Sequence, residues 1–313
     1  MTDGKKKVVL VGTGMVGMSF AYMAIAQGIC NELVLIDIDK ERAYGEALDL
    51  QHAVPFFHVN TKVSDGDYAD CADADIVVIP AGFPQHPGES RLDLVAKNAK
   101  VIRSIVDPLM ASGFQGIILV ASNPVDVMTY VAWKQSGLPT NRVFGSGTLL
   151  DSGRLRYALG TRLGVAPTSI HSYIIGEHGD SSVPAYSVAN IAGKRLSRFI
   201  EEQKISKEDL RNDYMYARDA AQAIIKRKRA TYYGIGAALA KLVRAVLRNE
   251  RVVMPVGAYL DGEYGQKDIY IGVPAVIGKR GVEDIIELEL AEEEKKSFEQ
   301  SATVLRETIK TVF

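Results

Sequence analysis

Gly12-Thr13-Gly14-Met15-Val16-Gly17 is the stretch of sequence that decides the fold. It matches the pattern G-x-G-x-x-G, directly after an apolar segment over residues 8–11 and at the start of a helical pattern over residues 15–27, which ends at Gly28. In this context the first glycine permits a tight turn, the second lets the backbone approach a pyrophosphate, and the third allows close helix packing. The stretch predicts a strand–turn–helix unit whose helix N-terminus binds dinucleotide phosphates. The alternative is a buried glycine-rich turn without a ligand.

Asp37 lies twenty residues after Gly17, at the end of the next apolar segment, Glu32–Ile36. A carboxylate at this position accepts hydrogen bonds from both hydroxyls of an adenosine ribose and repels a 2′-phosphate. The sequence therefore predicts NAD rather than NADP as the ligand. Arg42, five residues later, either reaches a phosphate of the same ligand or is a solvated charge on a helix.

Short, continuously apolar segments recur along the first half of the chain, separated by segments of helical periodicity. The apolar segments are Ile76–Ile79, Ile117–Val120 and 142–144, and the helical ones include 96–111 and 125–135. Buried parallel strands have this character because helices cover both faces of their sheet. We therefore predict an α/β fold in which residues 1–148 form a doubly wound parallel Rossmann sheet.

The pattern changes after residue 148. Helices are predicted over 151–163, 214–226, 236–247 and around Phe298, Ala302, Leu305 and Ile309, and strands over 169–175, 252–259 and 269–276, the last two joined by the turn-rich segment 261–265. This mixture predicts an α+β substrate domain over residues 149–313, fused to the first domain without a long linker.

Composition indicates an ordinary soluble globular protein. The 313 residues are 47% hydrophobic and 24% charged, with a formal net charge of −1 and no basic block that would indicate a nucleic-acid partner. Cys30 and Cys71 are the only cysteines and lie far apart, so neither a zinc site nor a disulfide framework is expected. These features predict a cytoplasmic protein.

The N-terminus superficially resembles a signal anchor, because basic residues precede a long uncharged run. Lys5-Lys6-Lys7 is followed by no charge until Glu32. Gly12, Gly14 and Gly17 break that run, and each weakens an isolated helix. A strand, a glycine turn and a helix explain the run better than a membrane segment, and no membrane partner is expected.

Gly176-Glu177-His178-Gly179-Asp180 is the main candidate for chemistry. Glycines on both sides of His178 leave room for a small substrate, and an imidazole titrates near neutral pH, which suits proton transfer. Taken alone, His178 could equally be a structural histidine.

Charged and polar residues elsewhere supply possible partners. Asp151 and Arg154 share one face of a predicted helix, about 60° apart, whereas Arg156 lies about 200° from Arg154 and must point elsewhere. The polar segment 84–91 follows a strand end and is either a lid that brings Arg91 over a substrate or an ordinary surface loop. Asn123 also follows a strand end, where its amide binds a ribose or substrate oxygen, caps a helix, or does both.

Together these motifs resemble the bacterial, fructose-1,6-bisphosphate-responsive L-lactate dehydrogenases of the lactate/malate dehydrogenase superfamily. The matching residues are Gly12-x-Gly-x-x-Gly17, Pro84-Gln85, Arg91, Ser122-Asn123-Pro124-Val125-Asp126, Leu150-Asp151-Ser152-x-Arg154, Gly176-Glu177-His178-Gly179-Asp180 and Ala230-Thr231-Tyr232-Tyr233-Gly234. They span nearly the whole chain, so the combination is far more specific than any one motif.

The resemblance implies a role for each candidate. His178 would donate a proton to the keto oxygen of pyruvate, and Asp151 would accept a hydrogen bond from its other ring nitrogen. Arg154 would bind the substrate carboxylate by a two-point fork, and Arg91 would polarise the carbonyl. The pocket would be completed by Gln85, Asn123 and Thr231. No metal would be required.

The resemblance also implies which residues contact NAD. These are Gly12, Gly14, Met15, Val16, Gly17, Asp37, Arg42, Tyr68, Ala81, Gly82, Ser104, Ala121, Asn123, Ser146 and Ile235, with Ile235 against the nicotinamide.

Gln85 distinguishes the substrates of this superfamily. A malate dehydrogenase has arginine at the matching position to bind the second carboxylate of oxaloacetate, and burying that carboxylate beside a neutral side chain is costly. Pyruvate and L-lactate are therefore the expected substrates. The alternatives are malate or another 2-hydroxy acid, or a non-catalytic NAD-binding protein, although the latter should have lost His178, Asp151 or Arg154. Metal-dependent glycosidases share the fold, but the sequence shows no matching metal cluster.

Arg156 and His171 are the implied effector residues. If residues 169–178 form one strand, the odd separation of His171 and His178 puts the two imidazoles on opposite faces, so that His171 points away from the active site. In allosteric bacterial lactate dehydrogenases the matching pair binds the phosphates of fructose 1,6-bisphosphate at an interface of a homotetramer. The alternative is an interface salt bridge or solvated charges.

Several residues depart from the usual family pattern. Phe83 is bulkier than the common alanine, and His86 and Ser90 replace lysine and threonine in the lid. Gly153 stands where alanine is usual, and Arg229 where glycine is common. No catalytic group is lost.

Overall fold

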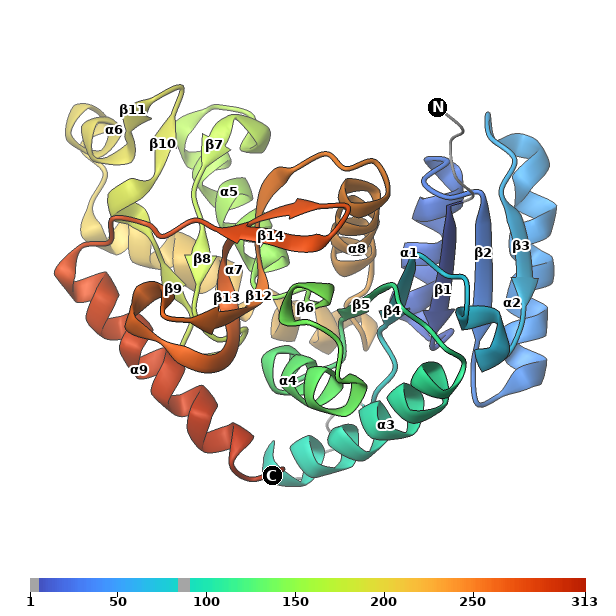
Figure 1. The fold of residues 1–313 in the computed structure, drawn as a ribbon. Coiled ribbons are helices and arrows are strands. Elements are labelled where there is room, and N and C mark those ends of the chain that lie inside the picture. The colour runs from blue at the N-terminus through green and yellow to red at the C-terminus, as the bar shows by residue number, and fades with distance from the viewer. Residues whose placement is uncertain (1–5, 84–90) are drawn as a thin grey trace.

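A computed structural model describes residues 6–83 and 91–313, with only the backbone of Arg91 (Figure 1). In this part of the chain one nine-stranded sheet has the order β14-β13-β12-β6-β5-β4-β1-β2-β3. Its parallel part consists of β1 (Lys7–Val11), β2 (Glu32–Ile36), β3 (Lys62–Asp65), β4 (Ile76–Ile79), β5 (Ile117–Val120) and β6 (Val143–Gly145). The predicted doubly wound α/β architecture is confirmed.

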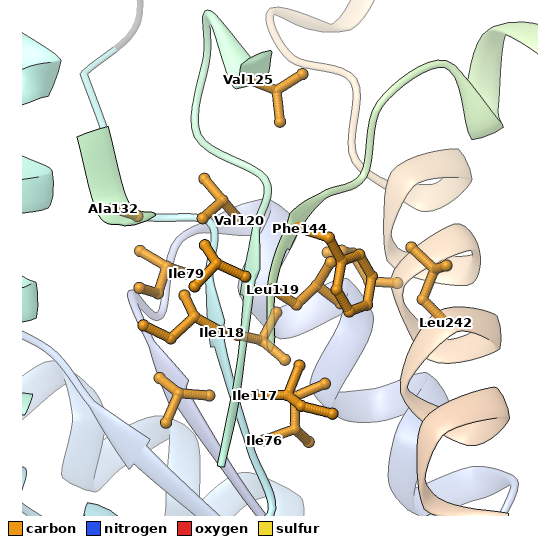
Figure 2. Packing of buried hydrophobic residues seen from close by; sticks show 14 of the residues in the cluster. Ile76, Ile79, Ile117, Ile118, Leu119, Val120, Val125, Ala132, Phe144 and Leu242 are labelled. Atoms are coloured by element: carbon orange, nitrogen blue, oxygen red, sulfur yellow. The ribbon is translucent and has the colours of Figure 1, made fainter. Parts of the chain in front are cut away.

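Helices cover both faces of the parallel strands, which is why every residue of β1, β2, β4, β5 and β6 is buried. The helices of this half are α1 (Met15–Ala26), α2 (Lys40–Ala53), α3 (Arg91–Ala111) and α4 (Val125–Ser136). Figure 2 shows the buried strand residues between Ala132 of α4 on one side and Leu242 of α8 (Tyr233–Leu247) on the other. Continuous apolar strands are therefore required by the packing, as the sequence indicated.

The glycine turn between β1 and α1 is too tight for side chains at two of its positions. Gly12 has a φ of +117°, and a Cβ there would lie 2.9 Å from Cβ of Ala81. A Cβ at Gly17 would lie 2.1 Å from the carbonyl oxygen of Gly12. These contacts let the helix begin directly against the strand, as the motif predicts.

Two elements of the first half differ from the sequence expectation. Strand β3 was not predicted, because Lys62-Val63-Ser64-Asp65 has one apolar residue and lies at the edge of the sheet, where a single buried side chain suffices. Helix α3 begins at Arg91 rather than at residue 96. Its first turn therefore carries the residue that was expected to belong to a lid.

The second half extends the same sheet with antiparallel strands. Strands β12 (Val252–Asp261) and β13 (Lys267–Gly278) form the predicted hairpin, β14 (Gly281–Ile285) pairs with β13, and β12 joins β6 through Gly257 and Gly145. The helices are α5 (Leu149–Leu163), α6 (Leu196–Gln203), α7 (Lys207–Lys228), α8 and α9 (Glu292–Ile309). Helix α8 packs against α1, so the two halves share one core.

The prediction of one continuous strand over 169–175 is wrong. The segment forms β7 (Ile170–His171) and β8 (Ile174–Ile175), which belong to different small sheets: β7 pairs with β10 (Asn190–Ile191), and β8 with β9 (Val183–Pro184). The break falls at Ser172, whose carbonyl accepts a hydrogen bond from Nε of Arg156 instead of a strand neighbour. The partner of the Ser172 carbonyl lies sixteen residues earlier in the chain, so the local pattern of residues 169–175 does not reveal the break.

Arg229, one of the departures from the family pattern, lies at a position that favours glycine. It is the C-cap of α7 and has a φ of +72°, in the left-handed region where glycine is favoured and other residues cost about 1–2 kcal/mol. The neighbouring Lys228 places its ammonium over the rings of Tyr232 and Tyr233, at 3.5 and 4.0 Å from their centroids. These cation–π contacts stabilise the segment that follows α7.

Two glycine substitutions should have opposite effects on stability. We expect Gly17→Ala to destabilise the fold by about 3 kcal/mol or more, because the new methyl would overlap the Gly12 carbonyl and force the backbone apart. Gly153→Ala should stabilise it by up to about 1 kcal/mol, because a Cβ on this exposed residue of α5 meets nothing within 4 Å. Chemical unfolding measures both changes, and equal stabilities would contradict the packing described.

Candidate active site

His178 lies in the loop between β8 and β9, and backbone contacts fix the start of this loop. Gly176, with a φ of +92°, exchanges two backbone hydrogen bonds with Gly272 of β13, at 2.9 and 3.0 Å. The next N–H, that of Glu177, donates to Oγ of Ser301 in α9 at 2.8 Å. The loop that carries the imidazole is therefore anchored to both the central sheet and the last helix.

The imidazole of His178 is paired with the buried carboxylate of Asp151 on α5. Nδ1 lies 2.5 Å from Oδ2, and the His178 side chain is 28% exposed, against 9% for Asp151. The charge of Asp151, opposed by burial, raises the pKa of His178 to about 9. At neutral pH the pair therefore consists of a protonated imidazole and a carboxylate. None of the hydrogen bonds among the described residues involves Nε2 of His178.

Arg154 binds the same carboxylate from one helical turn further along α5. Its Nη1 donates to Oδ1 of Asp151 at 3.1 Å, and the Arg154 side chain is 11% exposed. Burial alone would raise the pKa of Asp151, but the charges and hydrogen bonds of His178 and Arg154 hold it below its usual range. The remaining N–H groups of the Arg154 guanidinium can still form a fork with a substrate carboxylate.

Arg156 points to a different place from Arg154, as the helical spacing predicts. Its Nε donates to the Ser172 carbonyl at 2.9 Å, and its guanidinium lies 5.2 Å from the ring centroid of Tyr173. Burial lowers the pKa of Arg156, and none of its described contacts is with a carboxylate. The Ser172 carbonyl directly follows His171, an exposed residue of β7, so both expected effector residues lie at the same small sheet.

Asp37 is fixed at the carboxyl end of β2, beside the glycine turn. Its Oδ2 accepts hydrogen bonds from N and Oγ1 of Thr13, at 2.7 and 2.8 Å, and its Oδ1 accepts one from the Asp39 N–H at 3.0 Å. Partial burial opposes ionisation, but these hydrogen bonds and the charge of Arg42 lower the pKa of Asp37. Nε of Arg42 also lies 4.0 Å from a carboxylate oxygen of Glu46. This ion pair is consistent with the alternative that Arg42 is a charge on the helix surface.

The N-terminus of α1 fits a phosphate group. Gly14 is its N-cap, and no side chain caps the helix. A Cβ at Gly14 would meet nothing within 4 Å, and Met15 is exposed. Free N–H groups at an open helix N-terminus, with the fixed carboxylate of Asp37 nearby on the next strand, suit the pyrophosphate and ribose of a dinucleotide.

Other expected cofactor residues lie at the carboxyl ends of β4, β5 and β6. Ala81 touches the turn at Gly12, and Gly82, Ala121, Asn123 and Ser146 follow the three strands, with Ser146 buried. Ile235 lies in the first turn of α8, next to Gly236. A Cβ added at Gly236 would lie 2.7 Å from Cβ of Ser19 in α1. This close helix contact brings Ile235 to the first turns of α1, and Thr231 and Val16 are half-buried in the same part of the fold.

Tyr68 and Ser104 are the remaining expected cofactor residues that the structure describes. Burial is the main cause that raises the pKa of Tyr68 to about 12. The nearby charge of Asp37 contributes to the same shift. Ser104 is exposed on α3 and donates to the Val101 carbonyl, within its own helix. Gln85, His86 and Ser90 lie outside the described residues, as does the expected lid, and of Arg91 only the position at the start of α3 is described.

Two buried polar residues were not recognised from the sequence. Asn98 of α3 joins two strand ends, because its Nδ2 donates to the carbonyls of Asn123 and Phe83 at 2.7 and 3.1 Å. Asp126 of α4 accepts the backbone N–H of His178 at 2.8 Å. A polar residue on the apolar side of a predicted helix was the available signal for Asn98, whereas the partner of Asp126 depends on tertiary structure alone.

The described residues contain neither a metal-binding cluster nor a membrane-spanning helix. Across residues 6–83 and 92–313, no three side chains of His, Cys, Asp or Glu gather in a group that could hold a metal ion. No helix in the described part of the chain combines the length and apolar character needed to cross a membrane.

Known proteins resemble the chain over its whole length. Residues 6–145 match the lactate/malate dehydrogenase NAD binding domain, and residues 148–313 match the lactate/malate dehydrogenase alpha/beta C-terminal domain. L-lactate dehydrogenase 2 of Bacillus anthracis is 55% identical over 313 residues, and L-lactate dehydrogenase 1 of Bacillus cereus (strain ATCC 10987 / NRS 248) is 53% identical, each covering 100% of both chains. The ligand-bound crystal structure of the minor L-lactate dehydrogenase from Enterococcus mundtii superposes with a TM-score of 0.97 at 48% identity, covering 99% of each chain. The chain therefore belongs to the lactate/malate dehydrogenase family, with NAD as its cofactor.

Proposed function

We propose that the chain is an L-lactate dehydrogenase, which interconverts pyruvate and L-lactate with NADH and NAD. The observation that carries this proposal is the Asp151 carboxylate held between His178 and Arg154, with the imidazole protonated and partly exposed. NADH supplies the hydride that is added to the carbonyl carbon of pyruvate. The chain itself must bind the substrate carboxylate, polarise the carbonyl and deliver one proton.

His178 delivers the proton to the carbonyl oxygen. Its Nε2–H bond breaks as the new O–H bond forms, which leaves a neutral imidazole and L-lactate. Asp151 holds Nδ1 in the protonated form throughout, so it orients the ring and stabilises the charged state before transfer. In the reverse direction the neutral imidazole accepts the hydroxyl proton of L-lactate.

Arg154 is assigned to the substrate carboxylate, because its guanidinium lies beside the catalytic pair and retains unused donors. Asn123 and Thr231 complete the substrate pocket in this proposal, and Arg91 polarises the carbonyl. The sequence resemblance assigns Gln85 to selection of the substrate. A neutral side chain there favours pyruvate over oxaloacetate, whose second carboxylate would be left without a counter-charge.

Cys30 and Cys71 support a reducing compartment for this enzyme, which we propose to be the cytoplasm. Both are free thiols buried in the core. Burial raises the pKa of each to about 12, so that neither is a reactive thiolate at neutral pH.

The substrate assignment predicts the result of changing Gln85. NADH oxidation should be rapid with pyruvate and slow with oxaloacetate, and Gln85→Arg should shift the ratio of the two kcat/KM values toward oxaloacetate by about a hundredfold, since a charged hydrogen-bonded pair contributes about 1.5–3 kcal/mol. An unchanged ratio would contradict the role of Gln85. If the unmodified protein oxidises NADH with neither acid, the remaining alternatives are a dehydrogenase for another 2-hydroxy acid and a non-catalytic NAD-binding protein.

The pH dependence follows from the His178–Asp151 pair. Pyruvate reduction needs the protonated imidazole, so kcat/KM should stay level as the pH rises and then fall through about pH 9, whereas lactate oxidation should rise through the same range. Asp151→Asn removes the largest cause of the raised pKa, so the decline in pyruvate reduction should begin about two pH units lower. Asp213→Asn, at a buried carboxylate of α7 bonded to Arg162, is the matched control and should leave the profile unmoved. Equal profiles for all three proteins would contradict the role of Asp151 in keeping His178 protonated.

We also propose an effector site at the small sheet of β7, β10 and β11 (Lys194–Arg195). Directly paired residues lie on the same face, so the buried Ile170 and Ile191 define the inner face, and His171, Asn190 and Arg195 share the outer one. Arg156 lies beside the backbone that follows His171 and has no carboxylate partner in the described contacts. Arg156, Arg195 and His171 at one small sheet suit the phosphates of fructose 1,6-bisphosphate, and two-fold symmetry in a homotetramer would double this set.

Effector binding is tested by charge removal on this face. Arg156→Gln and His171→Gln should each raise the half-maximal concentration of fructose 1,6-bisphosphate at least about tenfold and leave kcat without effector unchanged. Lys194→Gln is the control, because Lys194 pairs with the inward residue Ile191 on the same hairpin. A pyruvate saturation curve that millimolar bisphosphate does not change would exclude the effector site, while leaving the dehydrogenase assignment intact.

A further inference from the structure

Asp126 is a buried carboxylate with a direct bond to the catalytic loop. It lies in the first turn of α4, its residue is 2% exposed, and its Oδ2 accepts the backbone N–H of His178 at 2.8 Å. The two partners come from different halves of the chain. This hydrogen bond therefore ties the proton donor to the half of the protein that binds NAD.

The other oxygen of Asp126 has no hydrogen-bond partner among the described residues. Oδ1 is fully buried, and it lies where a Cβ on Gly257 of β12 would come within 3.1 Å. An unpartnered carboxylate oxygen in the core is costly, since the ordinary arrangement satisfies every buried polar atom. A side chain that served only to cap α4 would bond to the N–H groups of that helix, and no described bond of Asp126 does so.

The imidazole of His178 is the titrating positive charge near Asp126. His178 contacts Asp126 through its backbone N–H, Asp151 of α5 and Glu177 of the catalytic loop are neighbouring carboxylates, and Arg154 of α5 acts on His178. On the remaining side β6 and β12 contribute Gly145 and Gly257, which carry no charge. Burial, with smaller contributions from Glu177 and Asp151, raises the pKa of Asp126 to about 7. The hydrogen bond from the His178 N–H and the charge of His178 oppose this rise.

We propose that Asp126 is a positioning residue for the proton donor, acting in two ways: its carboxylate fixes the His178 backbone to the amino end of α4, and its negative charge helps Asp151 to hold the imidazole in the protonated form. The first action matters because Asn123 lies three residues before Asp126, at the same end of α4. The bond thereby sets His178 in register with the residue expected beside substrate and nicotinamide. The proposal rests on His178 as proton donor in the proposed function.

Two substitutions separate the backbone tie from the charge. Asp126→Asn retains an oxygen that can accept the His178 N–H but removes the charge. At pH 6 its kcat should stay within about threefold of the unmodified enzyme, while the alkaline decline of pyruvate reduction moves about one pH unit lower. Asp126→Ala removes both features. Its kcat at pH 6 should fall at least about tenfold with a smaller change in the KM of pyruvate, because misplacement of the donor affects the transition state more than substrate binding.

Asp213→Asn is again the matched control, because it removes a buried carboxylate that bonds to Arg162 instead of the catalytic loop. The unfolding midpoint of each variant is measured alongside the kinetics. A purely structural Asp126 would lower that midpoint and leave both the pH profile and kcat of the folded variants unchanged, which would overturn the proposal. If Asp126→Ala does not fold, the pH profile of Asp126→Asn decides alone.

A direct titration keeps this test separate from the proposed function. The ring protons of His178 can be followed by NMR between pH 5 and 10, and assigned with the variant His178→Gln. The midpoint should lie about one pH unit lower in Asp126→Asn than in the unmodified protein, whether or not the protein reduces pyruvate. An identical midpoint in the two proteins contradicts the proposed charge. Absence of pyruvate reduction with a shifted midpoint would instead contradict the proposed function alone.

Discussion

The bond between His178 and Asp151 is the interaction on which the site depends. A carboxylate is costly to bury, and Asp151 is stable in the core because an imidazolium and a guanidinium bind its two oxygens. The same arrangement makes the imidazole a stronger base than a free histidine and so keeps it protonated at neutral pH. One buried anion thus serves stability, orientation and proton delivery.

The rest of the fold brings three distant segments to that anion. Helix α5 supplies Asp151 and Arg154, the β8–β9 loop supplies His178, and α4 holds the loop through Asp126. Glycines allow these segments to approach: Gly176 and Gly272 pair backbone to backbone, and Gly257 and Gly145 join β12 to β6. The two halves therefore share a sheet as well as the α1–α8 contact. Their relative position is fixed by this shared packing.

The elements that the sequence predicted well are those whose patterns report burial directly. Continuous apolar runs gave β4 and β5 with their observed bounds, because each strand is covered on both faces and every side chain must be apolar. Strand β3 escaped prediction because one buried side chain, Val63, leaves almost no pattern. The segment 169–175 looked like one strand because its break is made by a bond from Arg156, sixteen residues away from Ser172.

The sequence by itself determined the fold class, the dinucleotide turn and the chemical types at the site, because local patterns and spacing follow from burial and from backbone geometry. It also separated Arg154 from Arg156, since helical periodicity is a local property. Only the tertiary structure decided that Arg154 shares the Asp151 carboxylate and that Asp126 holds the backbone of His178. The latter contact joins residues 52 positions apart, and a carboxylate in the first turn of a helix does not reveal which distant N–H it will meet. That pairing is fixed by how the two halves pack.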